Sequence, residues 1–469
     1  MCVNGWCSCF GSSHGIDCRH GPESSLRTRR HHGLAIYVYE VPSFLSFAVH
    51  SVGSIYRAER AFLNTLLIDE HHRTTDPEAA DLFLVPFWSV QGPAGWRYCD
   101  RGRLEMIVEW LRAHHPYWDR SGGRDHVFFL TGDQGACGLG AAALNAIFVV
   151  HWGLLGSPSR MAAIASGEYT QSHFRNTSTA DFERALQSGR WCYSPAKDVL
   201  AAPFITSSQQ SVEATDASQA SARRLLVHAG GIYGWRKYAS SSNDKAWYSL
   251  GVRQRLYHIV RQAANSTGAL PIESHGVRIA SPSGARDYGS LLRSSHFCLA
   301  PAGLGWGVRM SEAVLHGCMP LTAQPFVVQP LEEVSSWSAP RIDDIDVIGP
   351  TLFARLREWA ADEAYAPRRA ETIRVLRQAL AWDRLAYNYT LLALCHRAVE
   401  LRGTLKSGSR AGCAQMARAL PGASLVRHEP SWFTPALREA IRAIQRDRRR
   451  ALTESAEPAA LDSRQRSPD

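Results

Sequence analysis

The sequence predicts an α/β protein made of two successive halves, each containing a parallel sheet. Short apolar segments typical of buried strands alternate along the chain with amphipathic segments typical of helices. The alternation stops at residues 205–222, which are poor in large apolar side chains, and then begins again. The chain has 469 residues, of which 45% are hydrophobic, and one ordinary core does not accommodate that length. We therefore expect two α/β domains with extensions.

The first half shows strand and helix patterns in alternation. Near its start, Ile36 and Val38 alternate with Tyr37 and Tyr39, which predicts a strand that ends before Pro42. A helical stretch covers 54–72, and an apolar strand is expected over 82–86. Another helix is predicted over 101–116, followed by buried strands over 127–130 and 146–153.

The second half repeats this order. A strand over 224–231 precedes a helix over 248–265, a further segment over 277–280 and a helix over 286–295. The strand that starts at 296 leads into a glycine-rich turn and another helix. Beyond about residue 400 the strand pattern is lost, and the polar end, 454–469, is expected to be disordered.

The net charge of +9 does not predict nucleic-acid binding. Much of the excess lies in local runs, at Arg27, Arg29 and Arg30 and again in "RDRRR" at 446–450. Such runs are usually solvated, and no zinc finger or RNA-binding motif accompanies them. A basic balance also suits anionic substrates such as sugar nucleotides. No apolar run of about 18 residues exists to span a membrane.

The glycine-rich turn at 303–307 is the main candidate for a ligand site. Gly303, Gly305 and Gly307 give G-x-G-x-G, which differs from the dinucleotide spacing G-x-G-x-x-G. The stretch has no lysine for a phosphate-binding Walker loop, and Gln324 stands where a dinucleotide site would need an acid. A nicotinamide-dependent oxidoreductase is therefore disfavoured.

Arg309 and Glu312 lie on one face of the helix that follows the turn. An arginine can bind a diphosphate with two parallel hydrogen bonds, and a carboxylate can accept both hydroxyls of a ribose. The pair therefore predicts a nucleotide-linked substrate. The simpler alternative is a surface salt bridge between the two residues. Gly230 and Gly231 also follow a strand directly, where bare backbone permits close approach of a ligand.

These residues resemble the core of exostosin-like glycosyltransferases, glycosyltransferase family 47. The family pattern F-C-L-x-P-x-G, then R-x-x-E-A-x-x-x-G-C-x-P, is matched at Phe297, Cys298, Leu299, Pro301, Gly303, Arg309, Glu312, Ala313, Gly317, Cys318 and Pro320. The stretches "IYVYEVP", "TTDPEAADLFLVP", "GGRDHVFF" and "YSLGVRQRLY" also resemble family segments. The matches run in order from about 34 to 340.

The resemblance implies a GT-B architecture: two facing Rossmann-like domains, an N-terminal acceptor domain over 34–204 and a C-terminal nucleotide-sugar domain over 223–400. Residues 205–222 would be a linker or mobile loop, and 401–469 a helical, basic extension. The implied reaction is an inverting sugar transfer from a nucleotide sugar, UDP-linked, to a glycan acceptor, with no cofactor or metal required. The oligomeric state is not predicted.

The resemblance also assigns roles within this sequence. Arg309 and the glycine-loop amides would hold the diphosphate, and Glu312 the ribose. Arg236 and Arg253, near the first glycine turn, are further candidates for binding the diphosphate. The candidates for the catalytic base are Asp125, His126 and Asp133. For Asp125 the alternative is a structural pair with Arg124, and His151 is expected to be a packed histidine.

Two departures from the family pattern lie in the predicted acceptor domain, so the resemblance does not settle the chemistry of the acceptor side. Glu40 replaces the usual aspartate, and "TGDQGAC" replaces a loop that usually contains "HDWG". A non-catalytic pseudoenzyme that binds glycans or partners is therefore the alternative function. The sequence D-x-D at Asp344 and Asp346 superficially resembles a GT-A manganese site, but it lies after the nucleotide motif, so we expect no metal.

The first 20 residues resemble the second half of an EGF-like module. Cys2, Cys7, Cys9 and Cys18 have glycines between them and lack the paired C-x2-C knuckles of a zinc site. The resemblance implies a Cys9–Cys18 disulfide and partners for Cys2 and Cys7 that precede this chain. We then expect a truncated sequence whose membrane anchor is missing, and residues 21–33 as a linker.

Sequons at Asn176, Asn265 and Asn388 agree with an oxidising compartment. Together with the cysteine-rich start, they lead us to expect the Golgi lumen.

Overall fold

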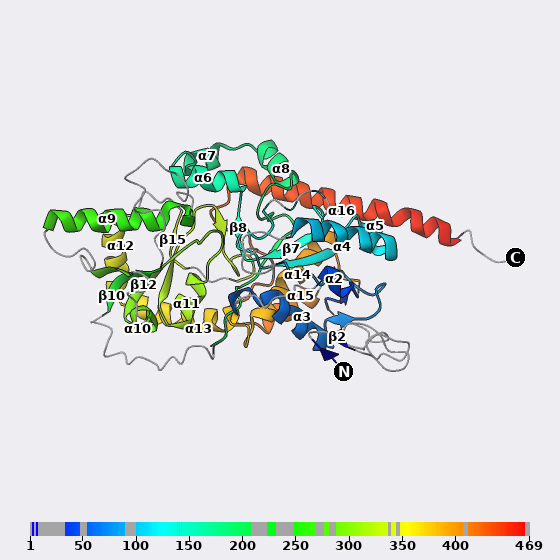
Figure 1. Cartoon of the computed structure of the whole chain (residues 1–469), viewed down its shortest axis with the longest axis horizontal. Helices are drawn as coiled ribbons and strands as arrows, with labels where there is room; N and C mark the ends of the chain where they lie inside the picture. Colours follow the sequence, from blue (N-terminus) through cyan, green and yellow to red (C-terminus); the bar gives the residue numbers. More distant parts are fainter. Residues whose placement is uncertain are drawn as a thin grey trace.

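The computed structural model describes residues 2–3, 6–7, 33–46, 54–89, 100–137, 139, 141, 143–207, 223–230, 248–267, 276–280, 288–335, 339–343, 348–406 and 411–464. Figure 1 shows two α/β halves side by side along the long axis, with the C-terminal helix α16 (Pro435–Arg464) running along the first half. β1 (Cys2–Val3) and β2 (Trp6–Cys7) form an antiparallel pair. Cys9 and Cys18 of the expected EGF-like module lie outside the described residues.

The first half is built on a six-stranded sheet in the order β4-β3-β5-β6-β7-β9. Every strand pair in it is parallel. The strands are β3 (Ile36–Val38), β4 (Arg73–Thr74), β5 (Leu82–Leu84), β6 (His126–Leu130), β7 (Ile147–Val150) and β9 (Val199–Leu200). All their residues are buried, as expected for a parallel sheet covered on both faces.

Helices connect these strands. They are α2 (Ser43–Ser46), α3 (Ala58–Ile68), α4 (Arg101–His114), α5 (Tyr117–Ser121), α6 (Pro158–Ser166), α7 (Gln171–Asn176) and α8 (Thr179–Gln187). The start of α4 is fixed by Asp100, whose side chain accepts a hydrogen bond from the Arg103 amide. The helix ends at His114, and Pro116 follows its C-cap residue His115, where a helix cannot easily continue.

The second half contains a five-stranded sheet in the order β11-β10-β12-β13-β15, again parallel throughout. The strands are β10 (Arg224–Ala229), β11 (Val277–Ala280), β12 (Ser295–Pro301), β13 (Met319–Ala323) and β15 (Arg341–Ile342). Its helices are α9 (Val252–Thr267), α10 (Tyr288–Arg293), α11 (Arg309–Leu315), α12 (Pro350–Ala361) and α13 (Tyr365–Leu380). The predicted α/β class and the two parallel sheets are confirmed.

Two features join the halves. β8 (Gly153–Leu154) of the first half pairs antiparallel with β14 (Val327–Val328) of the second. After α13 the chain returns to the first half, where α14 (Ala386–Arg402) shares an apolar cluster with the first sheet. The domain boundaries expected from the sequence stay predictions: α14 begins within the predicted 223–400 unit, crosses its end and packs on the first sheet.

Two further helices, α15 (Gly412–Arg418) and α16, follow α14 and pack against it. α16 also packs against α5 and α8. Because α16 extends to Arg464, its helical path continues into the segment from 454 that the sequence predicts to be disordered. No described helix is long and apolar enough to cross a membrane.

Three disulfides lie within the described residues: Cys137–Cys192, Cys298–Cys318 and Cys395–Cys413. Each closes a loop inside one half or between C-terminal helices. Cys298–Cys318 joins β12 to the residue before β13, so it ties together the two strands on either side of the glycine-rich turn.

Candidate functional site

The glycine turns predicted from the sequence meet at the carboxyl edge of the second sheet. β10 and β12 pair directly, with Leu226 opposite Phe297. β10 ends at Ala229, before Gly230, and β12 ends at Pro301, before the glycine loop, which we define as residues 302–308. In open parallel sheets, ligands bind outside this edge.

Two arginines converge on Gly230. A Cβ atom added to Gly230 would lie 3.1 Å from Arg309 Nη2 and 3.4 Å from Arg253 Nη1. Arg253 is buried, and its Nη2 donates to the carbonyl of Ala302 at 2.9 Å. The structure therefore brings together Gly230, Arg253 and Arg309 as the sequence predicts. Gly231 and Arg236 lie outside the described residues.

Glu312 is paired with Arg309 in this structure. Arg309 Nη1 lies 2.9 Å from Glu312 Oε2, and the hydroxyl of Tyr288 donates to the same oxygen at 2.9 Å. Arg309 also donates to the Tyr288 hydroxyl. Burial and then the charge of Glu312 raise the pKa of Tyr288, which keeps the phenol neutral. The salt bridge between Arg309 and Glu312, which is the simpler alternative predicted from the sequence, is present, but it is part of a half-buried network with Tyr288.

The glycine loop lies against the first sheet. The amide of Trp306 donates to the carbonyl of Asp133 at 2.9 Å, and a Cβ on Gly305 would lie 1.7 Å from that carbonyl oxygen. The Trp306 indole Nε1 donates to the carbonyls of Thr131 and Gly132. Gly305 is therefore required for contact between the two halves, and its expected role at the phosphate stays a prediction.

Gly303 and Gly307 do not share this requirement. The amide of Gly303 bonds within the loop to the carbonyl of Gly305 at 3.0 Å, and its own carbonyl accepts from the amide of Ser249 at 2.9 Å. A Cβ on Gly307 would meet nothing closer than 3.5 Å. Their assignment to the diphosphate stays a prediction.

Asp133 is brought to the glycine loop. It follows β6 at the carboxyl edge of the first sheet, and its Oδ1 accepts a hydrogen bond from the Tyr56 hydroxyl at 2.7 Å. The ring of Tyr56 packs edge-on against Trp306, with centroids 5.3 Å apart. Of the three predicted candidates for the base, Asp133 faces the second half.

Asp125 and His126 lie at the opposite, amino end of β6. They are fully buried and bonded to each other at 2.9 Å, and His126 Nε2 also bonds the Tyr39 hydroxyl at 2.8 Å. Arg402 of α14 pairs with Asp125 at 2.6 Å. Burial raises the pKa of Asp125, but bonding to His126 and the charge of Arg402 outweigh it and lower the pKa to about 2. Both residues are enclosed in a structural network, and their assignment as the base stays a prediction.

Sequence reasoning missed several residues of this edge: Tyr56, His228, Tyr248, Tyr288 and Trp306. His228 could have been found, because it stands two residues before Gly230 in a strand and so shares its face. The others come from loops or distant helices. His151 is packed as expected: its Nδ1 bonds the Ala201 carbonyl at 2.8 Å, and burial lowers its pKa to about 4.

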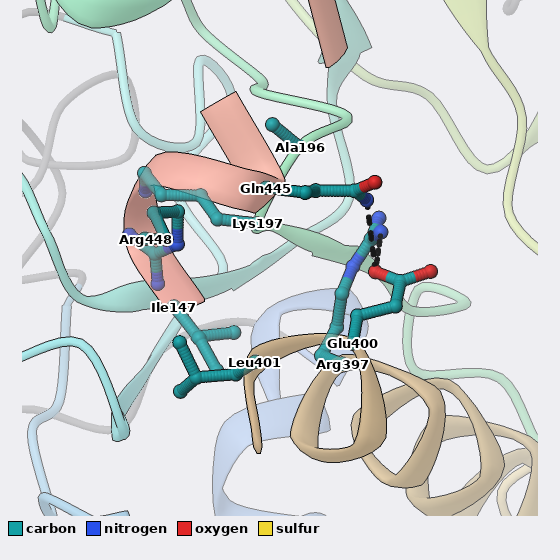
Figure 2. Close-up of a pocket in the computed structure, with 8 residues that line it drawn as sticks. All are labelled: Ile147, Ala196, Lys197, Arg397, Glu400, Leu401, Gln445 and Arg448. Atoms are coloured by element: carbon teal, nitrogen blue, oxygen red, sulfur yellow. Dashed lines mark hydrogen bonds and ion pairs between the residues drawn. The ribbon is translucent and has the colours of Figure 1, made fainter. Parts of the chain in front are cut away.

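A second cluster of charged side chains surrounds a pocket at the amino edge of the first sheet (Figure 2). It is lined by Ile147, Ala196, Lys197, Arg397, Glu400, Leu401, Gln445 and Arg448. Lys197 donates to the Ala146 carbonyl and to Asp198, and Arg448 donates to the carbonyls of Asn145 and Arg124. Burial lowers the pKa of Lys197 to about 8. Because these cations already bond the protein, the pocket is a structural junction of α14 and α16.

Within the described ranges, no three histidine, cysteine or acidic side chains are grouped so that they could hold a metal ion. Asp344 and Asp346 lie outside those ranges.

Comparison with known proteins agrees with the family resemblance. Residues 30–340 match the family model described as "Exostosin GT47 domain". A protein of Oryza sativa subsp. japonica named "Probable glucuronosyltransferase" is 24% identical over 395 residues, covering 81% of this chain and 84% of that protein. Two Arabidopsis thaliana proteins named "Probable glucuronoxylan glucuronosyltransferase" are 25% and 24% identical, covering 65% and 67% of this chain. The chain spans 59% and 64% of their lengths, respectively.

Solved structures give weaker likenesses. The glycosyltransferase of kitacinnamycin has a TM-score of 0.30 at 12% identity, covering 76% of this chain and 98% of that one. A trehalose 6-phosphate synthase from Burkholderia multivorans has a TM-score of 0.32 at 11% identity, covering 77% and 98%.

Proposed function

Because the chain belongs to the Exostosin GT47 domain family, a family of glycosyltransferases, we propose that it transfers a sugar from a UDP-linked donor to a glycan acceptor with inversion of the anomeric carbon. The observation that carries this proposal is the convergence of Gly230, Arg253 and Arg309 at one sheet edge, while the glycine loop beside them contacts Asp133 of the other sheet.

The donor half of the site supports diphosphate binding. The guanidinium groups of Arg253 and Arg309 both approach Gly230, which has no side chain. A guanidinium group can donate two parallel hydrogen bonds to the oxygens of a phosphate. The two arginines would stabilise the charge that develops on the diphosphate as the bond to the sugar breaks. Glu312 would accept the ribose hydroxyls after exchanging one of its bonds to Arg309 or Tyr288.

The acceptor half supports Asp133 as the general base. In an inverting displacement, the acceptor hydroxyl forms a bond to the anomeric carbon as the bond to the diphosphate breaks, and the base takes the hydroxyl proton. Asp133 stands at the carboxyl edge next to the glycine loop, and the Tyr56 hydroxyl fixes one of its oxygens. The relatives named for glucuronosyl transfer make glucuronic acid the first donor sugar to test, with a cell-wall glycan as acceptor.

The lumen of the Golgi is the proposed location. The three disulfides support an oxidising compartment, because such bonds are rare in reducing ones. Asn176 supports it further, since this sequon residue is exposed at the end of α7.

Nucleotide binding tests the donor half. We expect UDP or UDP-glucuronic acid at ~100 times its Kd to raise the free energy of unfolding by about 2.7 kcal/mol. Arg309→Ala should abolish this stabilisation, because it removes one of the two guanidinium groups at Gly230. Thermal shift and calorimetry measure both effects, with GDP, GDP-sugars and NAD(P) as competitors.

The matched control is Arg374→Ala, since Arg374 and Glu371 form an i,i+3 ion pair like that of Arg309 and Glu312 but on an exposed helix surface. This variant should keep the full ligand effect. If no nucleotide stabilises a cooperatively folded wild-type protein, the transferase proposal fails in favour of a non-catalytic glycan-binding protein.

A further inference from the structure

His228 is the third basic side chain at the point where the two arginines converge. It lies two residues before Gly230 on β10, and alternation along a strand places both on the same face. Its Cε1 atom is 3.4 Å from the position that a Cβ on Gly230 would occupy, which Arg309 and Arg253 also approach to 3.1 and 3.4 Å. The three side chains come from β10, α9 and α11.

The imidazole makes few hydrogen bonds for a buried polar ring. The side chain is 1% exposed, neither ring nitrogen makes a hydrogen bond of normal geometry, and only a weaker bond to the backbone of Leu299 acts on the ring. An imidazole has two ring nitrogens, and each buried polar atom left unpaired costs about 1–3 kcal/mol, so the ring can gain from a further partner. A ligand that is anionic and rich in acceptors would supply one.

The surroundings keep the ring uncharged. Burial, then the positive charges of Arg253 and Arg309, hold the pKa of His228 well below its usual value. The backbone of Leu299 on β12 forms a hydrogen bond with the ring, which opposes this lowering of the pKa in part. The carboxylate of Glu312 is already paired with Arg309.

We propose that His228 belongs to the diphosphate site and takes up one proton from solvent when a nucleoside diphosphate or nucleotide sugar binds there. The inference rests on the proposed function and adds a basic group and a proton to its donor half. The negative charges of the diphosphate offset those of the arginines and favour the imidazolium, which then donates a hydrogen bond to a phosphate oxygen. The proton comes from the buffer, and no bond of the ligand breaks.

Proton uptake by His228 makes the affinity for the nucleotide depend on pH. In the free protein His228 is neutral at neutral pH, and in the complex its pKa is higher. Affinity therefore rises as pH falls between the bound-state and the free-state pKa, by up to about tenfold per pH unit. Above the bound-state pKa, the affinity does not change with pH.

Calorimetry of the full chain tests the proposal. UDP-glucuronic acid is titrated at pH 7 in two buffers, one of low and one of high ionisation enthalpy, and the difference in heat gives the number of protons taken up. A nucleotide sugar is used because its diphosphate has no proton to exchange near neutrality. We expect an uptake of up to one proton in the wild type and none in His228→Gln, whose amide fills similar space but does not titrate.

His296→Gln is the matched control. His296 lies on β12 of the same sheet but next to its amino end, and burial, with the charges of Arg369 and Arg223, lowers its pKa to about 4. This variant should keep the wild-type uptake. The wild-type measurement stands even if His228→Gln does not fold.

The outcomes separate the two proposals. Binding without proton uptake in the wild type, or with uptake that persists in folded His228→Gln, overturns the role of His228 and leaves the transferase function intact. Failure of UDP, GDP and their sugars to bind overturns the function and this inference with it.

Discussion

Asp125 and Asp133 flank the same strand, β6, and only one of them lies where chemistry between the halves can occur. A five-residue strand is roughly 17 Å long, at about 3.3 Å per residue. At its amino end, Asp125 is held by His126 and Arg402. At its carboxyl end, Asp133 meets Tyr56 and the glycine loop.

Replacing the Asp133 carboxylate tests its role as base. Asp133→Asn should lower kcat by about 10²–10⁴-fold, because an amide does not accept the proton of the acceptor hydroxyl. Nucleotide binding, measured by calorimetry, should stay within about twofold of the wild type. Asp119→Asn, which alters an exposed carboxylate paired with Arg112, is the control and should leave both quantities unchanged. Wild-type turnover in Asp133→Asn would exclude this residue as the base.

At this scale the sequence predicts residue types better than positions. The stretch "GGRDHVFFLTGDQ" offers two acids and a histidine, and nothing in it says which end of the strand faces the second half. Arg309 and Glu312 were predictable because helical spacing fixes their shared face. Trp306, His151 and Tyr56 come from distant parts of the chain, and their contact depends on how the two sheets are placed.

At the scale of elements, the glycine loop has two tasks that a sequence pattern does not separate. Its end leads into α11, where Arg309 reaches Gly230. Its middle, Gly305 and Trp306, rests on the carbonyls of residues 131–133. The loop therefore sets the distance between the donor residues and Asp133.

Gly305→Ala tests this contact. The added methyl group would lie 1.7 Å from the Asp133 carbonyl oxygen, so the loop must move away from the first sheet. We expect a loss of about 1–3 kcal/mol in the free energy of unfolding, as for other overpacked sites, and a loss of transfer activity. Denaturant unfolding measures the first effect. Gly33→Ala, with no atom within 4 Å of the added carbon, should change stability by less than about 0.5 kcal/mol. Equal stability of the two variants would contradict the required close approach.

The strands and helices were largely predictable from periodicity, and the disulfides were not. Cys298 and Cys318 belong to the family pattern, yet their pairing depends on β12 and β13 being neighbours in the sheet. Cys137–Cys192 and Cys395–Cys413 likewise need the tertiary fold. Spacing along the chain alone does not distinguish among the many possible pairings.

For the whole molecule, a buried network joins the first sheet, the second half and the C-terminal helices. Glu333, which follows β14, accepts from Tyr193 at 2.5 Å and pairs with Arg397 of α14 at 3.1 Å. Arg427 bridges Glu333 and Glu400 at 2.5 and 2.6 Å. Opposite charges that are buried together hold a fixed arrangement because each loses much if its partner leaves.

Passage through the secretory pathway is tested at Asn176. When the chain is expressed with a secretory signal in a eukaryotic host, we expect an N-linked glycan at Asn176, because this side chain is exposed, and none at Asn388, which is half-buried within α14. Mass spectrometry before and after amidase treatment measures both. Asn176→Gln should remove the mass shift at that site. An unmodified Asn176 together with free thiols at Cys137, Cys192, Cys298, Cys318, Cys395 and Cys413 would contradict the lumenal location.

The return of α14 and α16 to the first sheet has a consequence for the order of synthesis. A ribosome completes the strands of the first sheet early, but the helix that covers one of its faces begins only at Ala386 and the last one at Pro435. Until then Val38, Val149 and their neighbours in that cluster lack part of their cover. A chain that stops before Ala386 would therefore lack part of the cover of the first sheet, and the first half is not expected to be expressed well as a fragment without α14 and α16.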